Sequence, residues 1–511
     1  MEKRIIALFS AVCILLGALL WRTMDVGQKQ ETQVLQRTNT RVLTVGTSRG
    51  VIYDRNLQPL APSDERLIAA AAPCEAAMQT MTALFGKDAA KQMLLRGAPC
   101  LAKAAQQVET PFVRTFSVPV RRGDSALAAH LIGTLDGENH GSGGIEKAFD
   151  ALLRRYSGSL SVRFSVDAAG RVLPGEAKEI LDANFNSKGG VALTIDSEMQ
   201  RVTEAALQNS RIQSGCAVIM DVQTGEIRAM ASVPSFDTEA ANPSLSPFTN
   251  KALGAYSVGS VFKPLLAAFA LEHGVKRSFS YTCTGTCQIG ETQFQCFGKK
   301  AHGKQTMKEA LENSCNTYFI RLMQKIDETA FLSFCETLGF SRPLPLCDGL
   351  FCSKGSLPAA RDLLLPGERA NFAFGQGRLL ASPVQLLSVY QLLATGLQTP
   401  PTVLCGTVDE HGALQRETPF APVRRLKETT VRQMQALLAA SAKAAGTVGA
   451  GKTGTAQSGI FADEKEVCRT WFAGFFPAKM PRYAVVILNE NGVSGAADCA
   501  PVFGEICRAL P

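Results

Sequence analysis

The chain has 511 residues, with 53 Lys and Arg against 45 Asp and Glu and a formal net charge of +8. At roughly 100–200 residues per domain, this length predicts about two to four domains. A content of 46% hydrophobic and 19% charged residues is typical of a chain that buries real cores, which excludes disorder over most of the length. The ordinary numbers of glycine and proline exclude a collagen-like protein. Because the positive charge is mild and no basic run with aromatic residues appears, we do not expect nucleic-acid binding.

One segment near the N-terminus, residues 5–21, is an uncharged apolar run that follows Lys3 and Arg4 and ends at Arg22. Crossing ~30 Å of hydrocarbon takes about 20 residues, with about 17 as the lower limit. The two basic residues predict that the extreme N-terminus is cytoplasmic and that everything after Arg22 is extracytoplasmic. A cleaved signal peptide is the alternative, but the end of the run lacks a good small-residue cleavage site. We therefore predict a cytoplasmic tail over 1–4 and a retained, single-pass transmembrane helix over 5–22.

Between this anchor and residue 188, the sequence patterns indicate helices and strands only weakly. Residues 23–40 are polar and suit a stalk, and alternation near 42–53 predicts short strands with breaks at Gly46 and Gly50. Residues 62–110 are Ala-rich with helical spacing. A Gly-rich stretch then precedes a predicted helix over 145–155. We predict a pedestal domain over 23–188, ended by a linker near 187–190.

The periodicity becomes clearer after this linker. A strand over 191–195 is followed by Asp196, which can cap a helix that ends near Asn209. Two apolar hairpins come first and last, with helical patterns between them, and these segments are 216–222, 226–233, 261–273, 307–325, 383–394, 428–444, 471–476 and 483–489. This order predicts an α+β domain over 189–511, with an antiparallel sheet in which the first and last hairpins are neighbours.

Fifteen cysteines are present, and the densest group is Cys283, Cys287 and Cys296, followed by Cys347 and Cys352. In an exported chain they can pair as disulfides. A zinc site is an alternative, although the spacings lack paired C-x-x-C units. Free thiols in a reducing habitat are a third alternative. The sequence leaves these states open, and our prediction from it includes no metal ion and no cofactor.

The first string that carries chemistry is Ser260-Val261-Phe262-Lys263, at the start of a predicted helix. Residues three apart share a helix face, so the lysine amine can reach the serine hydroxyl. A serine needs an adjacent base to act as a nucleophile, and a lysine can be that base only if its pKa falls well below ~10.4. Alone this motif is weak evidence for catalysis, because a helix-capping serine beside a solvated lysine has the same spacing.

Two further strings lie downstream. In Ser314-Cys315-Asn316, a hydroxyl and an amide can relay a proton and hold a peptide carbonyl, although this sequence alone resembles polar residues that interrupt a helix or form a turn between two helices. In Lys452-Thr453-Gly454-Thr455, a strand would direct Lys452 and Gly454 to one face and the threonines to the other. Glycine there permits close approach of a ligand to the backbone.

The three strings occur in the order of the S-x-x-K, S-x-N and K-T-G motifs, and the chain resembles class B, monofunctional penicillin-binding proteins. The stretch Arg49-Gly50-Val51-Ile52-Tyr53-Asp54-Arg55-Asn56 is similar to a signature of the family's pedestal. Further segments follow the family's order, and these are 143–146, 250–252, 302–303, 375–377, 382–383 and 471–474. Val258 replaces a usual proline and Ser382 a usual threonine, but neither change removes a catalytic atom.

The resemblance implies an irregular, β-rich pedestal of the family's dimerisation-like type, followed by a penicillin-binding transpeptidase domain with helices flanking its sheet. It implies that Ser260, activated by Lys263, attacks the penultimate D-Ala carbonyl of a peptidoglycan stem peptide, with Ser314 and Lys452 moving the proton. Asn316 would bind the acyl-donor amide, and Thr453, Gly454 and Thr455 would line the site of the terminal carboxylate. A β-lactam would acylate Ser260. The implied protein partners are a SEDS-type glycan polymerase and other membrane proteins of division, elongation or sporulation.

Several alternatives share these motifs. A D-Ala-D-Ala carboxypeptidase differs only in using water as the acceptor, which sequence does not distinguish from an amine. A β-lactamase would need a positioned carboxylate for deacylation, and no sequence motif that would supply this carboxylate follows Ser314. A penicillin sensor or polymerase-activating scaffold is the non-catalytic alternative, and the intact Ser260, Lys263 and Lys452 argue against it. His302 is interpreted as a turn or packing residue, Trp471 as core, and Gln376 as loop or active-site wall.

Overall fold

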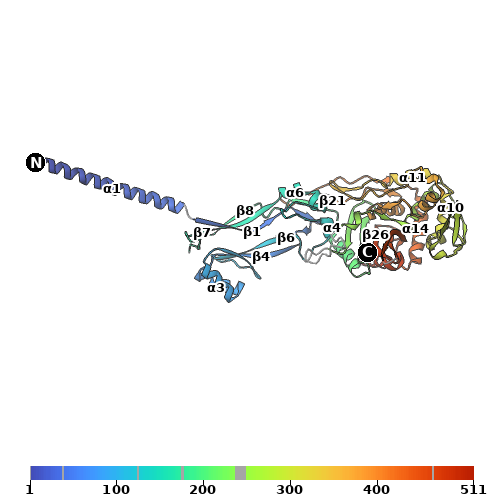
Figure 1. Cartoon of the computed structure of the whole chain (residues 1–511), viewed down its shortest axis with the longest axis horizontal. Coiled ribbons are helices and arrows are strands. Elements are labelled where there is room, and N and C mark those ends of the chain that lie inside the picture. Colours follow the sequence, from blue (N-terminus) through green and yellow to red (C-terminus); the bar gives the residue numbers. More distant parts are fainter. Residues whose placement is uncertain are drawn as a thin grey trace. The chain divides into compact units, whose positions relative to one another are not determined.

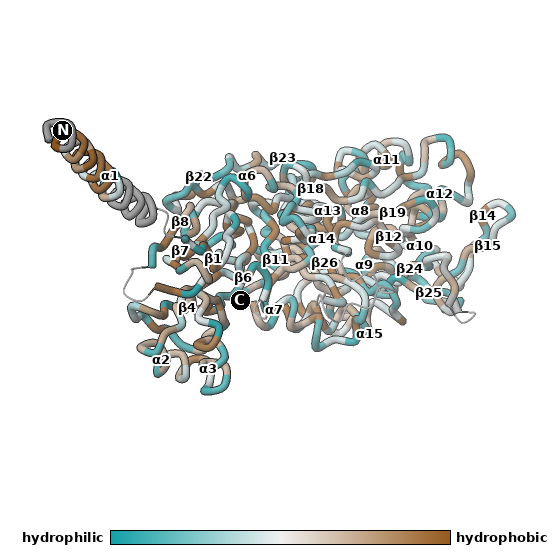
Figure 2. The backbone as a smooth tube through the Cα atoms, turned by 60° about the vertical axis from the view of Figure 1, so that its left-hand side comes forward, coloured by the Kyte–Doolittle hydropathy of each residue, from teal (hydrophilic) through white to brown (hydrophobic). Residues whose placement is uncertain are grey.

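The computed structural model describes residues 2–36, 39–123, 126–173, 178–235, 249–462 and 465–510, and Figure 1 shows its elements in chain order. Helix α1 runs over Glu2–Gln36, and its stretch Ile6–Asp25 is long and apolar enough to cross a membrane. In Figure 2, much of this apolar stretch has the brown colour of hydrophobic residues. The helix extends beyond the predicted apolar run, into the polar residues that were expected to form a stalk.

The protein divides into two structural units, and neither is one continuous stretch of chain. The first unit contains residues 1–49, 64–120 and 157–187, and the second contains 50–63, 121–156 and 188–511. Two segments of the predicted pedestal, 50–63 and 121–156, therefore belong to the same unit as the C-terminal part. A single boundary between 188 and 189 stays a prediction.

Besides α1, the described part of the first unit holds two three-stranded sheets and the helices α2 and α3. One sheet has the order β1-β7-β8 and the other β5-β4-β6, with helices α2 and α3 inserted between β4 and β5. The bounds are β1 Asn39–Ser48, β4 Asp64–Ala71, α2 Met78–Phe85, α3 Lys87–Arg96, β5 Cys100–Lys103, β6 Val113–Val120, β7 Gly158–Val166 and β8 Glu179–Ala183. The helical spacing predicted over 62–110 was wrong at β4 and β5. The alanines of β4 lie on the central strand, where pairing on both sides outweighs their helix propensity.

The main sheet of the second unit has five antiparallel strands in the order β11-β10-β26-β25-β24. Its strands are β10 Gly215–Asp221, β11 Ile227–Val233, β24 Ala450–Ala462, β25 Lys465–Phe476 and β26 Tyr483–Gly492. Strand β10 pairs with β26, so the predicted contact between the first and last hairpins is confirmed.

Alternate residues of these strands supply two cores. On one face, Val218 and Leu488 pack with the central helices α8 Lys263–Glu272, α13 Pro383–Thr395 and α14 Glu428–Ala444. On the other, Ile219 and Ile487 pack with α7 Ser197–Gln208 and α16 Ala500–Ala509. The carboxylate of Asp196 accepts hydrogen bonds from two backbone N–H groups of α7, which confirms the predicted cap. A sheet with helices on both faces agrees with the predicted α+β class.

A second sheet of this unit draws strands from distant parts of the chain. Its order is β22-β21-β9-β2-β3, with bounds Leu414–Arg416, Leu404–Val408, Gly190–Leu193, Val51–Tyr53 and Pro59–Ala61. Strand β2, from the Arg49–Asn56 signature, lies parallel to β9, and the expected break at Gly50 separates it from β1. From Gly50 onward, the signature is therefore part of the second unit.

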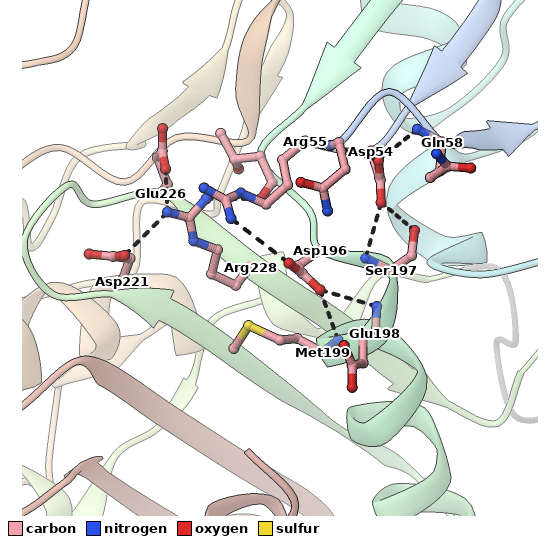
Figure 3. A network of polar contacts seen from close by, with 12 residues as sticks. Asp54, Arg55, Gln58, Asp196, Ser197, Glu198, Met199, Asp221, Glu226 and Arg228 are labelled. Atoms are coloured by element: carbon pink, nitrogen blue, oxygen red, sulfur yellow. Dashed lines mark hydrogen bonds and ion pairs between the residues drawn. The ribbon is translucent and has the colours of Figure 1, made fainter. Parts of the chain in front are cut away.

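A polar network fixes the turn after β2 (Figure 3). The carboxylate of Asp54, only 1% exposed, accepts hydrogen bonds of 2.8 Å from the backbone N–H groups of Asn56 and Gln58. Its second oxygen accepts a hydrogen bond of 2.7 Å from the hydroxyl of Ser197, at the start of α7. The backbone N–H of Arg55 donates to the carbonyl of Ile195. These bonds explain why an acidic residue is buried in this turn.

Candidate active site

Ser260 lies in a 3₁₀ turn, Gly259–Phe262, that continues into α8 and is followed one turn later by Lys263. The turn is held from two sides. Gly259, at φ +63°, donates its N–H to the carbonyl of Gly375 at 2.7 Å, and the hydroxyl of Tyr390 donates to the carbonyl of Val261 at 3.0 Å. Ser260 remains half-buried while its neighbours are buried. The local fold therefore presents this one hydroxyl at the surface of a packed helix start.

The amine of Lys263 connects this turn to the second motif. Its Nζ lies 2.7 Å from the carbonyl oxygen of Ser314, 3.2 Å from the Ser314 hydroxyl and 2.7 Å from Oδ1 of Asn316. The side chain is fully buried. Burial lowers the pKa of Lys263 to about 7, against the opposing effect of the Cys315 and Cys296 thiols. An amine with this pKa can exist as a neutral base near neutral pH.

The predicted helix over 307–325 is interrupted at the second motif. It forms α9 Met307–Glu312 and α10 Asn316–Met323, and Ser314 between them has φ +52°. Non-glycine residues rarely adopt this left-handed conformation, which persists only where the surrounding structure holds it. The break turns both oxygens of Ser314 towards Lys263, and an uninterrupted helix would not place them there.

The third motif lies on β24, at one edge of the main sheet. Lys452 and Gly454 are buried, whereas Thr453 and Thr455 are half-buried, and this alternation fits the two opposite faces predicted for the strand. Burial holds the pKa of Lys452 well below its ordinary value, and the positive charge of Lys263 lowers it further. The Nζ of Lys452 donates to the carbonyl of Thr453 at 3.0 Å.

Close packing brings β24 against the turn that carries Ser260. A Cβ added to Gly454 would lie 3.0 Å from Val261 and 3.3 Å from the carbonyl of Val258. A Cβ on Gly259 would lie 3.2 Å from the carbonyl of Thr455. Both positions require glycine because the two backbones are nearly in contact. The structure thus brings all three predicted strings to one place.

Several positioning residues were not identified from the sequence as parts of the site. Gly375 holds the turn through its carbonyl, and Tyr390 does so from α13. Trp471, predicted as core, is fully buried and donates its indole N–H to the carbonyl of Ser257 at 3.0 Å. The sequence Gly375-Gln376-Gly377 pointed to the first of these residues, Gly375. The hydrogen bonds of all three positioning residues, however, join positions too far apart in the sequence to be predicted from motif spacing.

Comparison with known proteins agrees with this geometry. Residues 215–508 match the family described as the penicillin binding protein transpeptidase domain. The chain is 28% identical to stage V sporulation protein D of Bacillus subtilis over 418 residues, which cover 76% of this chain and 63% of that protein. It is 27% identical to the peptidoglycan D,D-transpeptidase FtsI of Escherichia coli, over 97% of this chain and 88% of that protein.

The fold is also found among solved structures. Penicillin-binding protein 3 of Mycobacterium tuberculosis, complexed with aztreonam, superimposes with a TM-score of 0.65 at 22% identity, covering 92% of this chain and 96% of that one. Penicillin-binding protein 2 of Helicobacter pylori, solved in complex with MreC, gives a TM-score of 0.62 at 20% identity, covering 93% and 99%. The family match spans more than half of the sequence. The chain therefore belongs to the penicillin-binding proteins, and its C-terminal part is a peptidoglycan transpeptidase domain of the serine acyltransferase type.

Proposed function

We propose that the whole chain is a membrane-anchored peptidoglycan D,D-transpeptidase in which Ser260 is the nucleophile and Lys263 its general base. The observation that carries the proposal is the environment of the Lys263 amine. It is buried, has a pKa lowered to about 7, follows Ser260 by one helical turn and lies 2.7 Å from Asn316. A serine hydroxyl needs such a base to attack a peptide carbonyl.

In the first half-reaction, Lys263 takes the proton as Ser260 Oγ attacks the penultimate D-Ala carbonyl of a stem peptide. The backbone N–H groups of Ser260 and Thr455 would stabilise the oxyanion, and the packing of the Ser260 turn on β24 supports this role. The C–N bond then breaks and D-Ala leaves with a proton delivered through Ser314 and Lys452. The hydrogen bonds from Lys263 to Ser314 support such a relay.

Substrate orientation is assigned to the remaining residues of the motifs. Asn316 would bind the acyl-donor amide, and its Oδ1 is already oriented by Lys263. The hydroxyls of Thr453 and Thr455, with Gly454 between them, would hold the terminal carboxylate beside Lys452. In the second half-reaction, an amine from a neighbouring strand attacks the acyl-enzyme and releases Ser260. A β-lactam would stop at the acyl-enzyme stage.

The N-terminal residues support an orientation with the transpeptidase domain outside the membrane. Lys3 and Arg4 precede the apolar stretch of α1, which favours a cytoplasmic N-terminus. A SEDS-type glycan polymerase is the proposed membrane partner. A solved relative, penicillin-binding protein 2 of Helicobacter pylori, forms a complex with a protein named MreC, which supports a partner-binding role for this chain.

The test uses the full-length chain purified in detergent and incubated with a fluorescent penicillin. Wild type is expected to form a stable covalent label, and Ser260→Ala none. Ser257→Ala, three residues earlier in the same segment, is the matched control and should label like wild type, since it keeps the backbone carbonyl that accepts from Trp471. Absence of label on folded wild type, or label on Ser260→Ala, would contradict the assignment of the nucleophile.

A second experiment separates a transpeptidase from a carboxypeptidase. The wild-type chain is incubated with lipid-linked glycan polymer, and the products are digested and analysed by mass spectrometry. Cross-linked dimers that disappear after penicillin treatment are expected. Trimmed monomers without dimers would identify water as the acceptor and contradict the transpeptidase proposal.

A further inference from the structure

Four metal-ligating side chains meet beside the second motif, and the mechanism above uses none of them. These are Cys283, Cys296, His302 and Cys315, whose sulfur and nitrogen atoms all lie within 4.8 Å of one another. The three cysteines are buried and His302 is half-buried. All three thiols are free.

Three of the distances between these ligand atoms fit the tetrahedral coordination of one metal ion. Cys296 Sγ lies 3.7 Å from both Cys283 Sγ and Cys315 Sγ, and Cys283 Sγ lies 3.4 Å from His302 Nδ1. With Zn–S bonds of about 2.3 Å and Zn–N bonds of about 2.0–2.1 Å, a regular tetrahedron separates two sulfurs by about 3.8 Å and a sulfur from a nitrogen by about 3.5 Å. We propose that these four side chains bind one Zn²⁺ as a closed, structural Cys₃His site. Three soft thiolates with an imidazole favour zinc over harder cations.

The local backbone supports the same interpretation. Cys283 ends β13 Tyr281–Cys283, and the N–H of Gly285 donates to its sulfur at 3.3 Å. The hydroxyl of Thr317 lies 3.3 Å from the sulfur of Cys315 and 3.9 Å from that of Cys296. Such contacts orient metal ligands and stabilise the charge of thiolates.

The segment between α8 and α9 is built in a way that a metal centre would stabilise. Three of the four ligands come from residues 281–305, where the strands are short, two-stranded pairs: β13 with β16 Gly303–Gln305, and β14 Thr286–Ile289 with β15 Thr292–Gln295. Small two-stranded units are marginally stable alone, and a metal can supply the missing stabilisation. The ligand spacing, C-x12-C-x5-H-x12-C, lacks paired short units, which explains why the sequence led us to expect no metal.

The fourth ligand places this centre against the catalytic machinery. Cys315 is the central residue of the second motif, between Ser314 and Asn316, both of which accept hydrogen bonds from Lys263. The amide of Asn316 also donates to the carbonyl of Gln295, the neighbour of Cys296, at 2.9 Å. Zinc would therefore fix the backbone that directly follows Ser314 and so help to hold this residue in its left-handed conformation. This positioning role rests on the proposed function, but zinc binding itself does not.

The test measures zinc per chain by elemental analysis of the full-length protein in detergent, after zinc addition and removal of free metal. Wild type should retain one zinc ion, and His302→Ala at least about tenfold less. His302→Cys should retain it, because a Cys₄ site also binds zinc. Cys287→Ser is the matched control, since Cys287 is buried in the same segment but outside the cluster.

Alkylation and mass spectrometry of the wild type provide a readout that does not depend on any variant. Cys283, Cys296 and Cys315 should resist alkylation with zinc bound and react after a zinc chelator is added, and the chelator should lower the melting temperature. The proposal is overturned if wild type retains no zinc, if His302→Ala retains as much as wild type, or if two of these cysteines are joined in a disulfide. Because Ser260→Ala keeps all four ligands, it should still bind zinc, which separates failure of this proposal from failure of the proposed function.

Discussion

The indole N–H of Trp471 lies 3.0 Å from the backbone carbonyl of Ser257, so a strand of the main sheet holds the segment that leads to Ser260. The indole is fully buried on β25, next to the strand that carries Lys452, and its ring contacts Tyr256 edge-on at 6.1 Å. One side chain thus connects the segment of the first motif to the sheet that carries the third.

Replacing Trp471 by Phe keeps an aromatic ring but leaves the carbonyl of Ser257 without its donor. Loss of a buried hydrogen bond costs about 1–3 kcal/mol, so we expect acylation by a fluorescent penicillin to slow about tenfold. Phe475→Leu, which is buried on the same strand, controls for lost packing and should leave the acylation rate near that of wild type. Equal slowing in both variants would contradict a specific role for the indole.

The acylation rate should depend on pH through Lys263. Burial lowers the pKa of this lysine to about 7, and the groups that face it are Lys452 and the thiols of Cys296 and Cys315. Only the neutral amine accepts the Ser260 proton. The rate constant should therefore rise about tenfold per pH unit below that pKa and level off above it.

Stopped-flow acylation across this range is the measurement, with zinc content determined at each pH because acid also releases metal from its ligands. A rate that stays constant from about one unit above to about two units below that pKa, at constant zinc content, would exclude Lys263 as the base.

Among the glycines of the site, Gly375 should tolerate substitution by alanine least. It has φ +81°, and an added Cβ would lie 2.0 Å from the carbonyl of Gly259. Left-handed strain alone costs about 1–3 kcal/mol, and the clash displaces the turn that carries Ser260. We expect Gly375→Ala to lower the melting temperature and to slow acylation. Gly367→Ala, where nothing lies within 4 Å of the added Cβ, should change neither property.

The buried carboxylate of Asp54 should stabilise the second unit. Asp54→Ala removes the acceptor for Ser197, Asn56 and Gln58 and should lower the free energy of unfolding by about 2–4 kcal/mol. Asp54→Asn keeps one acceptor oxygen for the turn and should have a smaller effect. The exposed Asp88→Ala is the control. Thermal melting and limited proteolysis are the measurements. If Asp54→Ala is as stable as wild type in both, the polar network is dispensable.

The elements with strong periodicity were predictable from the sequence. The helix over 428–444 occurs with the predicted bounds, the cap at Asp196 is confirmed, and the hairpins pair as expected because alternation in each strand fits two buried faces. The motif order was enough to identify the family. Composition alone did not reveal β4, because its alanines are recruited into a sheet by partners far along the chain.

The finer geometry of the site depends on tertiary structure. The left-handed Ser314 is stabilised by a lysine 51 positions away, which no local propensity encodes. Likewise, Cys283 and Cys315 are 32 residues apart, and only the packing of α10 against the short strands brings their sulfurs together. Motif residues can therefore be named from sequence, whereas the contacts that tune them cannot.

Each of the two units is composed of separate stretches of the chain, and this matters for the choice of a truncation point. A fragment that begins at residue 189 lacks residues 50–63 and 121–156, and so loses strands β2 and β3 and the carboxylate that anchors the start of α7. Strand β9 would then be an uncovered sheet edge, a well-known cause of aggregation. Removing only α1 leaves every strand of both units in place. A soluble reagent for crystallography or inhibitor screening should therefore start before β1 rather than at the apparent start of the catalytic region.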